Sequence, residues 1–120
     1  MTNPPNAVDE DRAHALDDLV HLRVPVAEAI AALGRFPWDS DTELVTLDAD
    51  ALAHVLDRFL EGSLLPQALE DWANAVEGRD DIAFSSDDLI DHIAELANPL
   101  LYRPLNRTAI HTIHDQLDTS

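Results

Sequence analysis

The chain has 120 residues, of which 46% are hydrophobic and 5% aromatic, and it contains no cysteine. This length supports one hydrophobic core, and the lack of cysteine excludes disulfide frameworks, thiolate metal sites and a cysteine nucleophile. Acidic residues number 24 against seven basic ones, a net charge of −17, which predicts binding to neither nucleic acid nor anionic membranes. With no leader pattern and no apolar stretch of about 20 residues, we expect a cytoplasmic protein.

The N-terminal part of the sequence predicts a lead-in followed by two helices. Residues 1–7 contain two adjacent prolines and no apolar pattern, so we expect them to be disordered. Apolar residues at helical spacing then predict a helix over residues 8–23. Pro25 restarts the helix, and Gly34 is placed to end it.

The middle of the chain has the clearest helical pattern. Apolar residues form an unbroken face over residues 49–61, with Asp48 as the N-terminal cap and Gly62 as the end. The next helix is expected to begin at Pro66, because proline suits the first helical turn. The loop before these helices contains two large aromatic residues that should anchor it to the core, Phe36 and Trp38.

The last third of the chain predicts two further helices. Ile82 and Phe84 alternate as in a short extended segment, and Ser86 and Asn106 are each placed to cap a helix. Residues 8–120 are therefore predicted to form an all-α fold, a compact single-domain bundle of five to six short helices. We find no internal repeat and no strand pair long enough for a sheet.

No arrangement of residues predicts catalysis, so we expect no enzyme activity and no cofactor. Three glycines cannot build a phosphate-binding loop, and no serine stands in a nucleophile elbow. His111 and His114 have a spacing that can hold a metal, but they lack a further ligand, so surface histidines are the favoured interpretation. Acidic residues over positions 39–50 resemble a calcium loop, yet Leu44 replaces the glycine that such a loop needs for its turn.

A dense acidic segment follows the helix that contains Trp72. We expect Trp72 in the core and a local pair between Glu77 and Arg79 that fixes the turn. As structure, the segment is a helix end, a turn and the acidic first turn of the next helix. As function, it is a patch that faces a cationic partner. The candidate partner-binding residues are Asp71, Glu77, Asp80, Asp81, Asp87, Asp88 and Asp91.

Three stretches together resemble the small bacterial immunity proteins of contact-dependent growth inhibition systems (CdiI-type). They are Arg35-Phe36-Pro37-Trp38-Asp39-Ser40-Asp41 ahead of the helix over 52–60, Trp72-Ala73-Asn74 followed by Glu77-Gly78-Arg79-Asp80-Asp81-Ile82, and Leu96-Ala97-Asn98-Pro99 ahead of the closing helix. The resemblance covers residues 29–117. The chain departs from the family pattern at Leu64 and Leu65, which precede Pro66 where a polar helix cap is usual.

The resemblance implies a protein that binds and neutralises a cognate bacterial toxin domain, often a nuclease, and so protects the producing cell. A basic toxin would suit the acidic surface. Two other classes stay open: a non-enzymatic helical adaptor or regulator that binds a cationic or helical partner, and a metal-binding helical protein. An apolar groove would favour the adaptor. The sequence leaves the oligomeric state open.

Overall fold

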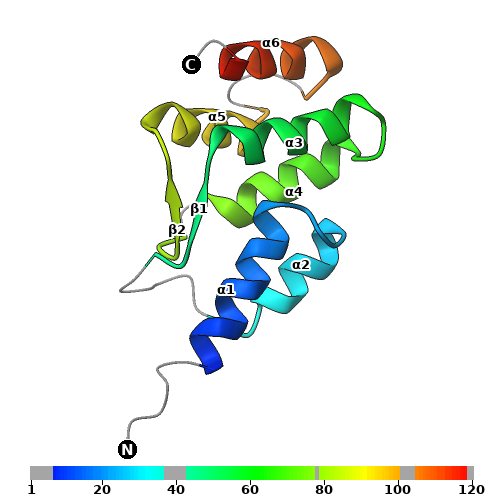
Figure 1. Cartoon of the computed structure of the whole chain (residues 1–120). Helices are drawn as coiled ribbons and strands as arrows, with labels where there is room; N and C mark the ends of the chain where they lie inside the picture. The colour runs from blue at the N-terminus through cyan, green and yellow to red at the C-terminus, as the bar shows by residue number, and fades with distance from the viewer. Residues whose placement is uncertain (1–6, 37–42, 78, 101–104, 119–120) are drawn as a thin grey trace, which may run out of the picture.

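A computed structural model of the chain describes residues 7–36, 43–77, 79–100 and 105–118 (Figure 1). These residues form six helices and one short sheet of two strands, so the fold is mostly helical, as predicted, but not purely all-α. The elements are α1 (Ala7–Val20), α2 (Val26–Leu33), β1 (Val45–Leu47), α3 (Ala49–Leu60), α4 (Pro66–Val76), β2 (Ile82–Phe84), α5 (Asp87–Ala97) and α6 (Arg107–Asp118). Of the predicted lead-in, residues 1–6 lie outside the described residues, and Ala7 already belongs to α1.

The two strands correct the prediction that the chain contains no strand pair. They run parallel, with Val45 opposite Ile82 and Leu47 opposite Phe84. The extended segment expected at Ile82 and Phe84 is thus confirmed as β2. Strands of three residues are too short to show a reliable period, and α3 and α4 lie between them in the chain, so their pairing has no local sequence signal. Because parallel strands end at the same edge of a sheet, the helices that follow them, α3 and α5, begin near each other.

The pairs α1–α2 and α3–α4 are joined by turns of the same type. A Schellman motif, with two backbone hydrogen bonds, closes the first helix of each pair. After α1, the N–H groups of Arg23 and Leu22 donate to the carbonyls of Asp18 and Leu19, respectively. After α3, the N–H groups of Ser63 and Gly62 donate to the carbonyls of Arg58 and Phe59. The motif needs one residue in the left-handed region, and these are Leu22 (φ 48°) and Gly62 (φ 88°). The predicted end at Gly62 is confirmed, whereas the first helix stops at Val20, short of residue 23, because the chain turns at Leu22.

Replacing Gly62 by alanine is expected to lower the free energy of unfolding by about 1 kcal/mol. The φ of 88° disfavours any residue with a side chain, and an added Cβ would meet no atom within 4 Å, so the cost is conformational and not steric. Urea denaturation of both proteins measures the difference.

The matched control for this change is Gly34→Ala. Gly34 has a φ of −61°, which alanine adopts freely, although the added Cβ would approach the Ala31 carbonyl to 3.3 Å. The stability of this variant should stay within about 0.5 kcal/mol of the wild type. Equal losses at the two glycines would contradict the assignment of the cost to the left-handed backbone.

Most of the predicted helix starts are confirmed. The Asp48 side chain accepts a hydrogen bond at 2.8 Å from a backbone N–H in the first turn of α3, and Asn106 does the same for α6 at 2.9 Å. Pro66 is the first residue of α4. Ser86 occupies the N-cap position of α5, but its hydroxyl makes no capping bond to that helix.

The core is a cluster of buried side chains to which all six described helices contribute. Trp72 is fully buried, as predicted, and its indole Nε1–H donates to the Leu19 carbonyl at 2.7 Å. Phe36 packs against this core, while Trp38 lies outside the described residues. Among the described helices, none is both long and apolar enough to span a bilayer.

Helix α6 lies across the end of the molecule, over α3 and away from α1 and α2 (Figure 1). Its buried residues Ile110 and Ile113 join the core. On the same side, His114 Nε2 lies 2.8 Å from Oδ1 of Asp57 on α3. Arg107 at the start of α6 also donates to the Leu60 carbonyl at the end of α3. Apolar packing and polar contacts therefore hold α6 against α3.

Candidate partner-binding surface

The acidic residues predicted to bind a partner do not form one surface. Asp71 lies on α4, Glu77 follows the last residue of that helix, and Asp80 lies in the turn before β2. The remaining members are Asp81, Asp87, Asp88 and Asp91. Asp81 is buried and Glu77 is half-buried, while the other five are exposed. The predicted patch is therefore divided among different surroundings.

Asp81 is fully buried, so it cannot belong to the predicted patch that faces a cationic partner. Its carboxylate has an exposure of 0% and accepts hydrogen bonds from two buried arginines. Arg12 Nε donates to Oδ2 at 2.8 Å. Arg79 donates twice, from Nε to Oδ1 at 2.9 Å and from Nη2 to Oδ2 at 3.1 Å. A carboxylate held in this way is part of the internal structure and is not accessible to a partner protein.

The Asp81 network joins three elements of the fold. Arg12 comes from α1, 69 residues earlier in the chain. The main-chain carbonyl of Asp81 accepts the N–H groups of Leu44 at 2.8 Å and Val45 at 3.3 Å, at the start of β1. The sequence favoured Glu77 as the partner of Arg79, but the partner seen here is Asp81. The turn is thus fixed by a carboxylate that faces inward.

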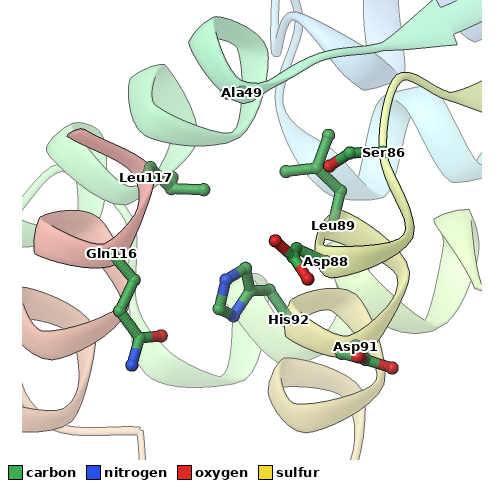
Figure 2. A pocket seen from close by; sticks show the side chains of 8 residues that line it. All are labelled: Ala49, Ser86, Asp88, Leu89, Asp91, His92, Gln116 and Leu117. Carbon is green, nitrogen blue, oxygen red and sulfur yellow. The ribbon is translucent and has the colours of Figure 1, made fainter. Parts of the chain in front are cut away.

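The exposed carboxylates of α5 border a hollow of about 350 Å³ (Figure 2). Asp87 and Asp88 stand in the first turn of α5, where their negative charges interact favourably with the positive end of the helix dipole. Asp88 and Asp91 line the hollow together with His92 and, from α6, Gln116. Carboxylate and amide oxygens can accept hydrogen bonds from a lysine or arginine side chain. We call Asp87, Asp88 and Asp91 the α5 acidic surface.

His92 and Gln116 are residues of this hollow that sequence reasoning missed. Nothing in the local sequence links them, because Gln116 lies on α6 and reaches the hollow only through the packing of α6 on α3. The start of α3 contributes Ala49, which the parallel sheet places beside the start of α5. Only the tertiary arrangement brings these residues together.

Asp71 lies apart from the α5 acidic surface. Its Oδ1 accepts a hydrogen bond from Gln67 Nε2 at 3.0 Å, one turn earlier on α4. It lines two hollows that α4 shares with α2, and none of their lining residues borders the α5 hollow. Asp71 therefore belongs to a second candidate surface.

Each arginine within the described residues contacts another group of the chain, although Arg23, Arg35 and Arg107 are exposed. Besides the two that bind Asp81, their contacts are Arg23 with the Asp17 carboxylate, Arg58 with the Leu22 carbonyl, Arg107 with the Leu60 carbonyl and Arg35 with the ring of Phe36. In the described part of the chain, no carboxylate of the α5 acidic surface stands in an ion pair with an arginine. Their negative charge is therefore left to solvent or to a partner.

The histidines singled out as possible metal ligands, both on α6, differ in their surroundings. His111 is exposed, whereas His114 contacts Asp57 on α3. The described residues contain no cluster of three histidine or carboxylate side chains that could hold a metal ion. Of the acidic stretch that superficially resembles a calcium loop, residues 39–42 lie outside the described ranges, and Leu44 leads into β1.

No family model, curated protein or solved structure significantly matches the chain. Two residues of the stretches that resemble immunity proteins have clear structural roles. Trp72 is buried in the core, and the Asn98 side chain donates to the Ala94 carbonyl at 2.8 Å where α5 ends. The chemistry of the exposed surface, and not similarity, therefore supports a functional proposal.

Proposed function

We propose that this chain is an immunity protein that binds and neutralises a cognate bacterial toxin domain with a basic surface. The observation that carries the proposal is the α5 acidic surface: exposed carboxylates beside a hollow, in a chain of net charge −17 whose arginines, among the described residues, pair with none of these carboxylates. A basic toxin domain offers the complementary charge. Binding would be stoichiometric, with one chain neutralising one toxin domain, and it requires no catalytic turnover.

The acidic surface supports recognition in two ways. At a distance, the negative field of the chain attracts a cationic partner and raises the rate of encounter. At contact, the hollow between α5 and α6 accepts a basic side chain beside Asp88, whose carboxylate points into the hollow, while the carboxylate of Asp91 points away from it (Figure 2). A partner that lost an essential lysine or arginine to this hollow would be inactive while bound.

Co-expression tests this function directly. The chain is expressed together with the C-terminal toxin domain encoded immediately upstream of it, and survival is compared with cells that express the toxin alone. Protection of the cells is the expected result. Survival no better than with the toxin alone would remove the immunity function.

Reversing the charge of the α5 acidic surface is expected to slow association with the toxin. The double variant Asp88→Lys/Asp91→Lys should reduce the association rate constant by about tenfold at low ionic strength, because electrostatic steering is lost. Surface plasmon resonance at low and high salt measures the effect, which should shrink as salt screens the charges.

A control variant separates the local effect from the change in net charge. Glu10→Lys/Asp11→Lys changes the net charge by the same amount on α1, where both side chains are exposed. Its association should be slowed much less than that of the α5 variant. Equal rates for the two variants would show that overall charge, and not the α5 acidic surface, guides the partner.

A helical adaptor that binds a cationic or helical partner is the second candidate. The observation that favours it is a mainly apolar hollow of about 630 Å³ between the α1–α2 turn and the α3–α4 turn. It is the largest of the hollows described here. The upstream-toxin experiment separates the two candidates, because an adaptor gives no protection against a toxin.

A further inference from the structure

Two hollows follow one another along α2 and α4. The larger, about 630 Å³, lies between the turns 22–25 and 63–65 and the first residues of both helices. The smaller, about 260 Å³, lies farther along and is lined by Ile30 of α2 and by residues of α4 such as Ala75. Asp71 lines both hollows. Because the two hollows share Asp71, we name them together the α2–α4 groove.

The walls of the α2–α4 groove are apolar although they face solvent. Helix α2 contains one charged residue among eight, and its exposed Ala27 and Ile30, at helical spacing, line the groove. Across the groove, Leu65 is 70% exposed, while its neighbour Leu64 is buried. The two leucines noted in the sequence therefore have different positions: Leu64 lies in the core and Leu65 lines the groove. In a strongly charged chain, such a surface is typical of a binding site.

The negative charge of the whole chain favours a cationic occupant, although the lining itself carries Arg23 and Arg58 besides Asp71. Among the lining residues described, Asp71 is the one carboxylate, and it stands midway where the hollows meet. Of the lining arginines, Arg58 donates to the Leu22 carbonyl and Arg23 pairs with Asp17. A second copy of the chain would bring another −17 charges to this surface, so self-association is disfavoured.

We propose that the α2–α4 groove binds an amphipathic, positively charged helix of a partner protein. Apolar side chains on one face of that helix fill the two hollows, and a lysine or arginine between them pairs with Asp71. A helix presents residues at i, i+3, i+4 and i+7 on one side, which suits two hollows in line between packed helices. The inference rests on the proposed binding function, but it concerns a surface separate from the α5 acidic surface.

A model peptide tests the groove without the natural partner. The probe is a synthetic peptide of about 14 residues, or roughly four turns, with leucines along one face and lysines elsewhere. Its counterpart has every lysine replaced by glutamate. Titration of the 15N-labelled full chain, followed by NMR, should give saturable shifts at α2 and the first half of α4 with the lysine peptide and none with the glutamate peptide.

Paired variants locate the binding. Ile30→Glu should weaken the binding of the lysine peptide to the chain by about tenfold, because it places a charge inside an apolar contact. Ile90→Glu is its control: the same substitution, at an isoleucine that is 48% exposed on α5 against 37% for Ile30. Asp71→Asn should weaken binding more than Asp91→Asn. If Ile30→Glu does not fold, Leu65→Glu replaces it.

Three outcomes would overturn the inference. They are shifts that concentrate on the α5 acidic surface, equal weakening by Ile30→Glu and Ile90→Glu, and no saturable binding of the lysine peptide. None of these outcomes depends on whether the chain protects cells from a toxin. Protection by the wild-type chain together with a failed peptide experiment would keep the immunity function and remove the groove.

Discussion

Replacing Asp81 by asparagine is expected to lower the free energy of unfolding by about 3–5 kcal/mol. The carboxylate is fully buried and binds two buried arginines, so asparagine would leave two guanidinium charges in the interior without their shared anion. This cost is a large share of the total stability of a domain, which is about 5–15 kcal/mol. Urea denaturation followed by far-UV circular dichroism measures it.

The neighbouring residue supplies the control. Asp80 is exposed, so Asp80→Asn makes the same chemical change in solvent and should alter stability by less than about 0.5 kcal/mol. A small loss of stability at both positions would mean that the burial of the two arginines does not depend on the Asp81 carboxylate. Arg12→Met combined with Asp81→Asn should cost less than the sum of the single changes, because the two residues act as a pair.

Trp72→Ala is expected to cost about 3–5 kcal/mol, because it removes the largest fully buried side chain of the core. Trp72→Phe keeps most of the apolar volume but loses the indole N–H that donates to Leu19. We expect this variant to lose about 1–2 kcal/mol. The cost stays small because the Leu19 carbonyl also accepts the Leu22 N–H at 3.2 Å.

Amide hydrogen exchange distinguishes the two tryptophan variants in space. In Trp72→Phe, faster exchange is expected mainly at the end of α1, where the indole binds Leu19, with little change in α5 or α6. In Trp72→Ala, the loss of core packing should speed exchange in most of the helices. Unchanged protection at the end of α1 in both variants would contradict a role for the indole in holding that helix.

The helices that could be predicted are those whose pattern is local. The expected helix over 49–61 is α3 (Ala49–Leu60), because its apolar residues repeat at helical spacing and Asp48 and Gly62 mark its ends. The end of α1 could not be placed, because a leucine occupies a left-handed position that glycine usually takes. The extended segment at β2 was predicted, but β1 and its pairing with β2 were missed, since three residues carry too little pattern to reveal a sheet.

The candidate surface was predicted less well than the helices for a different physical reason. A run of acidic residues shows where charge lies along the chain, but not which side chains turn inward. Asp80 and Asp81 are neighbours, yet one is exposed and the other is buried against Arg12, a residue 69 positions away. The apolar groove has only a weak trace in the sequence, the doublet Leu64-Leu65 before Pro66.

The long-range contacts of α1 also set an order of assembly. The helix is synthesised first, but its partners Trp72 and Asp81 follow their α1 contacts by 53 and 69 residues. At ~5–20 residues per second, α1 therefore waits roughly 3–14 seconds for the segment that completes its contacts. During this interval its apolar face has no native partner from α4. Docking of α1 is thus a late step of assembly. Substitutions that weaken the contacts of α1 with Trp72 and Asp81 should lower the yield of folded protein more than they lower its affinity for a partner protein.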